Sequence, residues 1–215
     1  MKFERLVDHF RNNPFFEWES VRALASCSDS LLANQLSQWA DQGKVIRCRK
    51  GKYLLSDRYR VLTPSVYYVA NYLYRPSYVS LATALQFYGL IPEAVELIQS
   101  VTPRHGREWS TKLADFSYRS IKRERFWGYH RESIDALSTQ NRFLIADPEK
   151  ALLDLFYLRS GAWTRERLGE MRFQSLEHID VDRLQSYTNR FASPKVSRAV
   201  DRFTGLYSGE LTGER

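Results

Sequence analysis

Cysteine and long apolar runs are the two clearest absences from this sequence of 215 residues. The two cysteines, Cys27 and Cys48, show no metal-ligand spacing, and so low a count is typical of a reducing compartment. We therefore expect both to fill small gaps in packing and the protein to be cytoplasmic. No stretch approaches the roughly 18 apolar residues of a membrane-spanning helix. The start, MKFERLVDHF, predicts a charged amphipathic helix and not a signal peptide, so we expect no membrane partner.

Catalytic and cofactor motifs are also missing. There is no glycine-rich phosphate loop and no serine in a nucleophile-elbow context, and the four histidines are scattered outside any metal motif. Asp147, Glu149 and Lys150 could hold Mg²⁺ in a nuclease. However, the strand-borne carboxylate with Glu-x-Lys spacing is absent, and all three residues fit the start of a helix. We therefore expect no enzyme activity, no metal site and no cofactor.

Positive charge is what the chain has in excess. It carries 32 Lys and Arg against 25 Asp and Glu, with a pI near 9.4, which favours an anionic partner. The excess gathers in residues 44–60, where seven basic side chains accompany a single acid, Asp57. A merely solvated surface usually mixes both signs. A second, weaker basic region runs from Arg104 to Arg125, with seven basic and three acidic residues.

The stretch from Cys27 to Leu55 contains the strongest pattern. Its first half predicts a helix that begins after Ser28 as N-cap and ends at Gly43 as the C-terminal glycine. At 100 degrees per residue, one side is apolar and the other is uncharged and rich in hydrogen-bonding groups. The apolar side has Leu32, Leu36, Trp39 and Ala40, and the polar side has Ser30, Asn34, Ser37 and Gln38. The second half predicts a two-stranded hairpin with a basic tip and Gly51 in the turn.

Two helices are predicted before this stretch, over residues 3–10 and about 18–25, so the order is helix, helix, turn, helix, hairpin. This is the order of a winged helix-turn-helix, in which the last helix can lie in the DNA major groove and the wing can reach phosphate. The predicted DNA-binding residues are Ser28, Ser30, Asn34, Ser37, Gln38, Arg47, Arg49, Lys50 and Lys52. Additional phosphate contacts are expected from Arg104, Arg107, Lys122 and Arg123.

A polar segment, residues 56–63, ends at Pro64 and predicts a boundary between a DNA-binding domain (1–60) and a larger domain (64–215). In the second domain we expect helices over 66–74, 78–90 and 147–158, then around 164–171, 180–190 and 194–206. Strands are expected over 95–102, 111–121, 126–130 and 143–146. The predicted fold class is therefore α+β, with an N-terminal winged helix-turn-helix followed by a larger mixed α/β C-terminal domain.

Tyrosines are dense between Tyr67 and Tyr78 and could form a stacking platform for single-stranded nucleic acid. They alternate with Val66, Val69 and Leu73 at helical spacing. We therefore expect these rings to pack in a core or an interface, with their hydroxyls at its edge.

Two motifs in the second domain resemble the AbiEi family of antitoxins. The first, YVSLATALQFYGLIP, runs from Tyr78 to Pro92 and precedes a strand that ends at Val101-Thr102. The second, ADPEKALLD, runs from Ala146 to Asp154. With the predicted winged N-terminus, the resemblance covers about residues 1–160. Members of this family belong to bacterial abortive-infection toxin–antitoxin operons, usually classed as type IV.

The resemblance implies a protein that binds inverted repeats in its own promoter and counteracts a nucleotidyltransferase-like toxin. We therefore expect a double-stranded DNA-binding autorepressor with antitoxin activity, either a monomer in solution or a dimer, which could bind DNA cooperatively. One alternative is a winged-helix regulator without a toxin, whose second domain binds a small ligand or dimerises; a deep apolar pocket with polar groups in that domain would favour it. The other is a nucleic-acid-processing enzyme using Asp147 and Glu149, favoured by Mg²⁺ between carboxylates.

Overall fold

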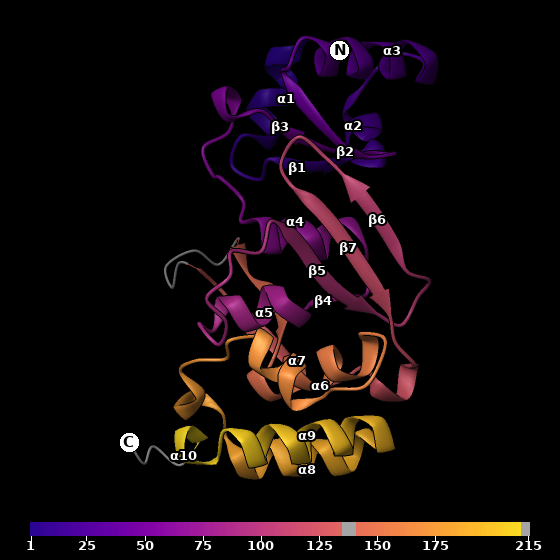
Figure 1. Cartoon of the computed structure of the whole chain (residues 1–215). Helices are drawn as coiled ribbons and strands as arrows, with labels where there is room; N and C mark the ends of the chain where they lie inside the picture. Colours follow the sequence, from indigo (N-terminus) through magenta and orange to yellow (C-terminus); the bar gives the residue numbers. More distant parts are fainter. Residues whose placement is uncertain (135–140, 212–215) are drawn as a thin grey trace.

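The protein has a mixed α+β fold, seen in a computed structural model that describes residues 1–134 and 141–211 (Figure 1). A three-stranded sheet lies in the N-terminal part, and a six-stranded mixed sheet lies in the middle of the molecule. Within the described residues, no helix combines the length and the apolar character needed to cross a bilayer. The broad fold class predicted from the sequence is therefore confirmed.

The first 60 residues contain three helices and a small antiparallel sheet of strand order β1-β3-β2. In chain order the elements are α1 (Phe3–Phe10), β1 (Phe15–Glu17), α2 (Trp18–Leu24), α3 (Asp29–Asp41), β2 (Val45–Arg49), β3 (Lys52–Leu55) and the 3-10 turn η1 (Asp57–Tyr59). The predicted helices and hairpin are all present, whereas β1 was not predicted. The two phenylalanines of β1 are buried on opposite faces of the sheet. Because β1 is so short and both faces are apolar, its sequence shows no alternation of apolar and polar residues from which a strand could be predicted.

The predicted ends of α3 are confirmed. Ser28 is the N-cap, and its Oγ accepts a hydrogen bond from the Leu31 backbone N–H at 3.4 Å. Gly43 follows the last turn with a φ of +68°, a left-handed conformation that costs glycine little because it has no Cβ. Leu32 and Leu36 on the inner side are fully buried, so α3 lies on the core with its polar side outward.

The remaining elements build the six-stranded sheet and the helices around it. The strands are β4 (Tyr78–Val79), β5 (Leu97–Thr102), β6 (Arg107–Ser110), β7 (Asp115–Ser120), β8 (Tyr129–Glu132) and β9 (Phe143–Ala146), in the order β6-β7-β5-β4-β9-β8. The helices are α4 (Val66–Leu73), α5 (Leu81–Phe87), α6 (Pro148–Leu158), α7 (Arg165–Glu170), α8 (Val181–Phe191), α9 (Pro194–Leu206) and α10 (Ser208–Leu211), with 3-10 turns η2 (Arg123–Arg125) and η4 (Leu176–His178). The pairs β4–β9 and β5–β7 are parallel, and the other pairs are antiparallel.

Two predictions about this part are wrong in detail. Tyr78 and Val79 do not begin a helix: they form β4, held between β5 and β9, and helix α5 begins only at Leu81. The strand predicted over 126–130 starts at Tyr129, after the turn η2, and strand β6 was not predicted. A two-residue strand such as β4 exists because it has partners on both sides, which no local pattern shows.

Helices cover both faces of the six-stranded sheet. Tyr118 pairs with Ser100, and Tyr78 pairs with Val101, the next residue along β5, so the two tyrosines point to opposite faces. On one face the Tyr118 hydroxyl donates to the Ala70 carbonyl of α4 at 2.7 Å. On the other face the Tyr78 hydroxyl reaches α6, and α8 and α9 pack behind α6 (Figure 1).

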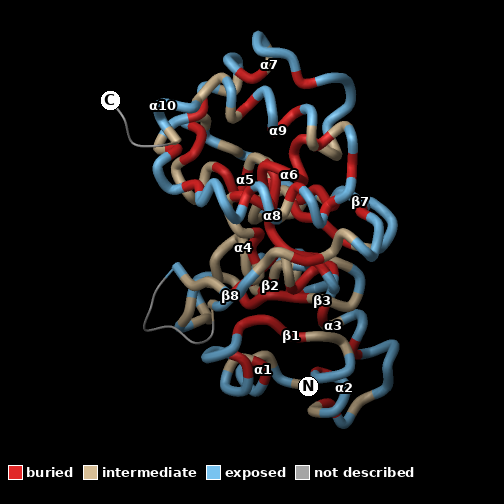
Figure 2. Tube along the Cα trace, turned by 90° about the horizontal axis from the view of Figure 1, so that it is seen from below, coloured by how far each residue is buried: buried red, intermediate tan, exposed pale blue. Residues whose placement is uncertain are grey.

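The N-terminal sheet is covered on both faces and joins two hydrophobic cores. Its inner face packs under α1, α2 and α3. Its outer face contributes Phe15, Cys48 and Leu54 to the core of the larger part, where the Phe15 ring lies 4.6 Å from that of Tyr72 in α4. Figure 2 shows the buried residues of both cores, one set near β1 and β3 and the other near α5 and α6. The chain crosses between the two parts at residues 56–65, but a packed interface connects them.

Candidate nucleic-acid interface

The exposed face of α3 carries the polar residues that the sequence assigns to base contacts. Asn34, Ser37 and Gln38 are exposed, and their side chains form no hydrogen bond with any residue that the structure describes. Ser28 and Ser30 are exposed as well, but their hydroxyls lie 3.2 Å apart and Ser28 caps the helix. The three residues from the middle of α3 are therefore the ones with free hydrogen-bonding capacity.

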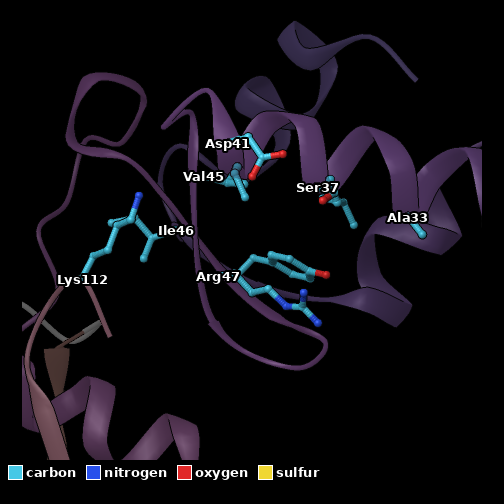
Figure 3. Close-up of a pocket in the computed structure, with 10 residues that line it drawn as sticks. Ala33, Ser37, Asp41, Val45, Ile46, Arg47 and Lys112 are labelled. Carbon is cyan, nitrogen blue, oxygen red and sulfur yellow. The ribbon is translucent and has the colours of Figure 1, made fainter. Parts of the chain in front are cut away.

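A hollow of about 360 Å³ lies between α3 and β2 (Figure 3). Ala33, Ser37 and Asp41 line it from successive turns of α3, and Arg47 of β2 lines it as well. Lys112 reaches the same hollow from the turn between β6 and β7. The sequence places Lys112 in a basic region but gives no sign that it lies near Arg47, because their proximity depends on how the β6–β7 hairpin packs against the N-terminal sheet.

The basic tip of the β2–β3 hairpin divides into two pairs of side chains. Arg47 and Lys50 are exposed and form no ion pair with a described residue. Arg49 and Lys52 are half-buried and face the rest of the protein. The β2–β3 register shifts between Arg47 and Arg49. Regular alternation would place both arginines on one face, and the bulge turns Arg49 to the other.

Arg49 and Lys52 are engaged in the interface with α4 and β6. Arg49 donates from Nη1 to the Leu73 carbonyl at 3.0 Å, and its guanidinium lies 4.7 Å from the centre of the Trp109 ring. Lys52 donates from Nζ to Glu17 Oε1 at 3.0 Å and to the Tyr72 carbonyl at 2.9 Å. Phosphate contacts were predicted for these two residues. In the structure their side chains instead connect the hairpin to the larger part of the fold.

This placement predicts that Arg49 matters for stability and that its neighbour Lys50 does not. Arg49→Ala should lower the free energy of unfolding by about 1–3 kcal/mol, since it removes a hydrogen bond to the Leu73 carbonyl and a cation–π contact. Lys50→Ala, the matched control, should stay within about 0.5 kcal/mol of the wild type because Lys50 is exposed. Urea unfolding of both variants measures the difference, and equal stabilities would contradict the packed position of Arg49.

The four predicted phosphate contacts of the second basic region, unlike Lys112, do not form one surface with α3. Thr102 pairs with Ser120 and Arg107 pairs with Tyr118, so Arg104 and Arg107 lie at the end of the hairpin opposite to Lys112. Lys122 and Arg123 follow β7 at that same distant end (Figure 1). Arg104 is further engaged, since it donates from Nη1 to the Arg75 carbonyl at 2.9 Å. These four predicted phosphate contacts are thus separated from the exposed face of α3.

The two sequence motifs, residues 78–92 and 146–154, meet in the core. Asp154 Oδ2 accepts hydrogen bonds from the hydroxyls of Tyr78 and Ser80, both at 2.9 Å. Lys150, one turn earlier in α6, forms an ion pair with Asp154 and donates to the Tyr78 hydroxyl at 2.9 Å. Both charged side chains have no exposed surface. Gly128 makes room for the lysine stem: a Cβ there would lie 3.0 Å from Lys150 Cγ.

Burial sets the electrostatics of this pair. Desolvation raises the pKa of Asp154, although the ammonium of Lys150 opposes the change, and it lowers the pKa of Lys150. Because the Tyr78 and Ser80 hydroxyls and the lysine fill the carboxylate's acceptor sites, the pair is compensated inside the core. The arrangement stabilises the contact between β4 and α6.

The acids at the start of α6 do more than begin a helix. Asp147 occupies the N-cap position, but its carboxylate bonds to His130 Nδ1 and to the Tyr187 hydroxyl, both at 2.7 Å, and does not cap. Glu149 is 1% exposed, its Oε1 accepts from the Asp180 backbone N–H at 2.9 Å, and burial raises its pKa. The two carboxylates thus have separate partners. Nowhere in residues 1–134 and 141–211 do three His, Cys, Asp or Glu side chains gather in a way that could hold a metal ion.

Comparison with known proteins adds no family assignment. Neither the models of known protein families nor the curated proteins contain a match to this chain. The resemblance to AbiEi antitoxins therefore depends on the two motifs in the sequence, and the hydrogen bonds between them give a physical reason for those residue types to occur together.

Proposed function

We propose that the protein is a DNA-binding autorepressor with antitoxin activity and that residues 1–60 act as a winged helix-turn-helix. The observation that carries the DNA-binding part is the exposed face of α3. It presents the unpaired amides of Asn34 and Gln38, and the hollow beside α3 is lined by the cationic side chains of Arg47 and Lys112. Lys50 adds an exposed cation at the hairpin tip, and none of the three cations forms an ion pair within the described chain. Free amides read base edges and free cations bind phosphate, so the face has the two kinds of group that DNA recognition needs.

In the proposed complex α3 lies in the major groove. The amides of Asn34 and Gln38 can each bond to adenine N6 and N7, and Leu31, which is 49% exposed, can contact a thymine methyl group. Arg47 and Lys50 then reach the phosphates on one side of the groove. Leu31 was not among the predicted DNA-binding residues, because an exposed leucine is recognisable only once the burial of its neighbours is known.

This model predicts a change of sequence specificity for Asn34→Ala. The loss of one bidentate contact should cost about 1–3 kcal/mol at the preferred site and leave binding to unrelated DNA nearly unchanged. Gln42→Ala is the matched control, since Gln42 is an exposed amide in the C-cap position of α3. Selection from randomised duplexes measures both. Identical preferred sequences for Asn34→Ala and the wild type would argue against base readout by Asn34.

The antitoxin part of the proposal is supported by the resemblance. The family binds inverted repeats in its own promoter and counteracts a nucleotidyltransferase-like toxin. The residues that carry the resemblance lie in β4, α5 and α6, whereas the proposed DNA-binding groups lie mainly in α3 and the β2–β3 hairpin. We therefore infer that repression and protection depend on different parts of the chain.

The test uses the full chain and the product of the adjacent gene. A reporter driven by the upstream DNA should be repressed by the wild type, and cells that express the neighbouring protein should survive only with it. Arg47→Ala with Lys50→Ala should lose repression and keep protection. The antitoxin role is refuted if the neighbouring protein is harmless, or if the wild type does not relieve its toxicity. In either case the reporter still tests DNA binding separately.

A second candidate function is a regulator without a toxin whose larger part binds a small ligand. The observation in its favour is a pocket beside α4 whose lining combines apolar side chains with polar groups. A reporter that responds to a small molecule, with no toxic neighbour, would support this candidate over the first.

A further inference from the structure

A pocket of about 480 Å³ opens between α4, residues 75–77 and the strands β8 and β9. Pockets of about 300–1,000 Å³ are typical of small-molecule sites. A water molecule takes only about 30 Å³ of liquid volume, so this pocket is much larger than a solvent site. Its polar lining consists of three arginines, two tyrosines, Ser77 and Asn71, and among the described residues no Asp or Glu lines it.

The three arginines, Arg75, Arg131 and Arg142, give the pocket its charge. All three are exposed, and none of their guanidinium groups forms an ion pair with an acid in the described chain. Glu17, whose pKa is lowered mainly by its hydrogen bond from Lys52 and to a smaller extent by the charge of Arg75, is already bonded to Lys52. Guanidinium groups bind carboxylate and phosphate oxygens through paired hydrogen bonds, and three around one pocket favour a ligand of more than one negative charge.

Unpartnered polar atoms lie in the wall of the same pocket. Ser77 is 2% exposed and its Oγ has no hydrogen-bond partner within the described chain. Asn71 accepts a bond from the Leu144 backbone N–H, yet its Nδ2 is buried without an acceptor. Buried polar groups are nearly always hydrogen-bonded, so these two atoms are an uncommon feature of the wall that lies behind the arginines.

Aromatic rings provide a flat surface beside this charge. The rings of Tyr68 and Tyr72 are nearly parallel, at 18°, with centroids 6.4 Å apart. Tyr72 is committed to the core, where it packs on Phe15, and Arg75 lies 5.3 Å from its ring centre. Tyr68 is only partly buried, so a planar group can stack on it. The pocket thus combines cations for phosphate with an aromatic face for a base.

We propose that this pocket binds a nucleotide, with the phosphate held by Arg75, Arg131 and Arg142 and the base placed against Tyr68. The recess favours a free nucleotide over the backbone of a DNA duplex, whose phosphates lie on a convex surface. The pocket shares no residue with the exposed face of α3, so nucleotide binding stands whether or not α3 binds DNA.

The test is calorimetric titration of the full chain with AMP, CMP, adenosine and inorganic phosphate. At least one of the two nucleotides should bind with a Kd below about 1 mM, the affinity expected of even a weak specific site. Adenosine and inorganic phosphate should each bind at least tenfold more weakly, because each lacks one half of the ligand. Arg131→Gln with Arg142→Gln should weaken nucleotide binding at least tenfold at an unchanged melting temperature. Arg123→Gln with Arg198→Gln is the matched control, because it removes two exposed charges elsewhere.

Three outcomes would overturn the nucleotide site. One is the absence of binding by either nucleotide at 1 mM. Another is nucleotide binding that the pocket double variant leaves unchanged. The third is a double variant that loses affinity for a random-sequence duplex while no free nucleotide binds, since this would assign the arginines to the DNA backbone. The comparison of AMP with adenosine uses the wild-type protein alone. It therefore still tests whether the phosphate contributes to binding if a variant folds poorly.

Discussion

Asp154→Ala should lower the free energy of unfolding by about 3–5 kcal/mol, the usual cost of breaking a buried ion pair by removing one partner. The substitution leaves the Lys150 ammonium in the core with the Tyr78 hydroxyl as its remaining hydrogen-bond partner. It also removes the acceptor for Ser80. For a chain of this size the loss corresponds to a decrease of about 6–20 °C in melting temperature. Urea unfolding followed by circular dichroism measures the change.

Two further variants separate burial from charge. Glu93→Ala breaks the exposed ion pair with Arg172 and should change stability far less than Asp154→Ala, because exposed ion pairs are screened by solvent. Lys150→Met combined with Asp154→Leu should recover part of the stability lost in Asp154→Ala, because it leaves no unpaired charge in the core, while the Tyr78 and Ser80 hydroxyls still lose their acceptor. If Asp154→Ala is no more destabilising than Glu93→Ala, the ion pair is not buried as described.

The largest expected effect on DNA binding comes from removing Arg47, Lys50 and Lys112 together. Each phosphate contact contributes about 0.9 to the slope of log K against log salt, so the triple alanine variant should lose about 2–3 units of slope. At about 0.1 M salt this corresponds to roughly several hundredfold weaker binding, shared by all sequences. Titration of a labelled duplex at several salt concentrations gives both quantities, and melting temperature should be unchanged because the side chains lie at the surface.

A matched variant removes the same charge from the distant end of the molecule. Lys122→Ala with Arg123→Ala and Arg198→Ala replaces three exposed basic residues far from α3. It should keep most of the salt slope, since loss of net charge without loss of contacts acts only through screened, long-range attraction. If both triple variants lose the same slope, DNA binding follows net charge and not the face formed by α3, the hairpin and Lys112.

Lys112 is the part of this face that tests the tertiary structure most directly. Its contribution exists only if the β6–β7 hairpin brings it beside the hollow between α3 and β2. Lys112→Ala alone should therefore account for about one third of the slope lost in the triple variant.

Elements with strong local patterns were predictable from the sequence. α3 was recognised from its apolar and polar sides and from its two ends, Ser28 and Gly43, and all of these features are present. α9 has the predicted bounds, Pro194–Leu206, and β9 has the predicted bounds, Phe143–Ala146. In each case the information lies within a few residues, because capping, periodicity and a short apolar run are properties of a continuous segment.

Features that depend on distant partners were decided by the tertiary structure alone. Strand β4 has two residues and needs β5 and β9 beside it, although its sequence fits a helix equally well. Arg49 turns inward because of a bulge, and Lys112 turns out to lie beside the hollow at α3. Lys150 fits the start of an ordinary helix in sequence, yet it is buried together with Asp154, whose carboxylate accepts hydrogen bonds from Tyr78 and Ser80. Charge and hydropathy establish which side chains are costly to bury, but only the packing of distant segments determines which of them find compensating partners.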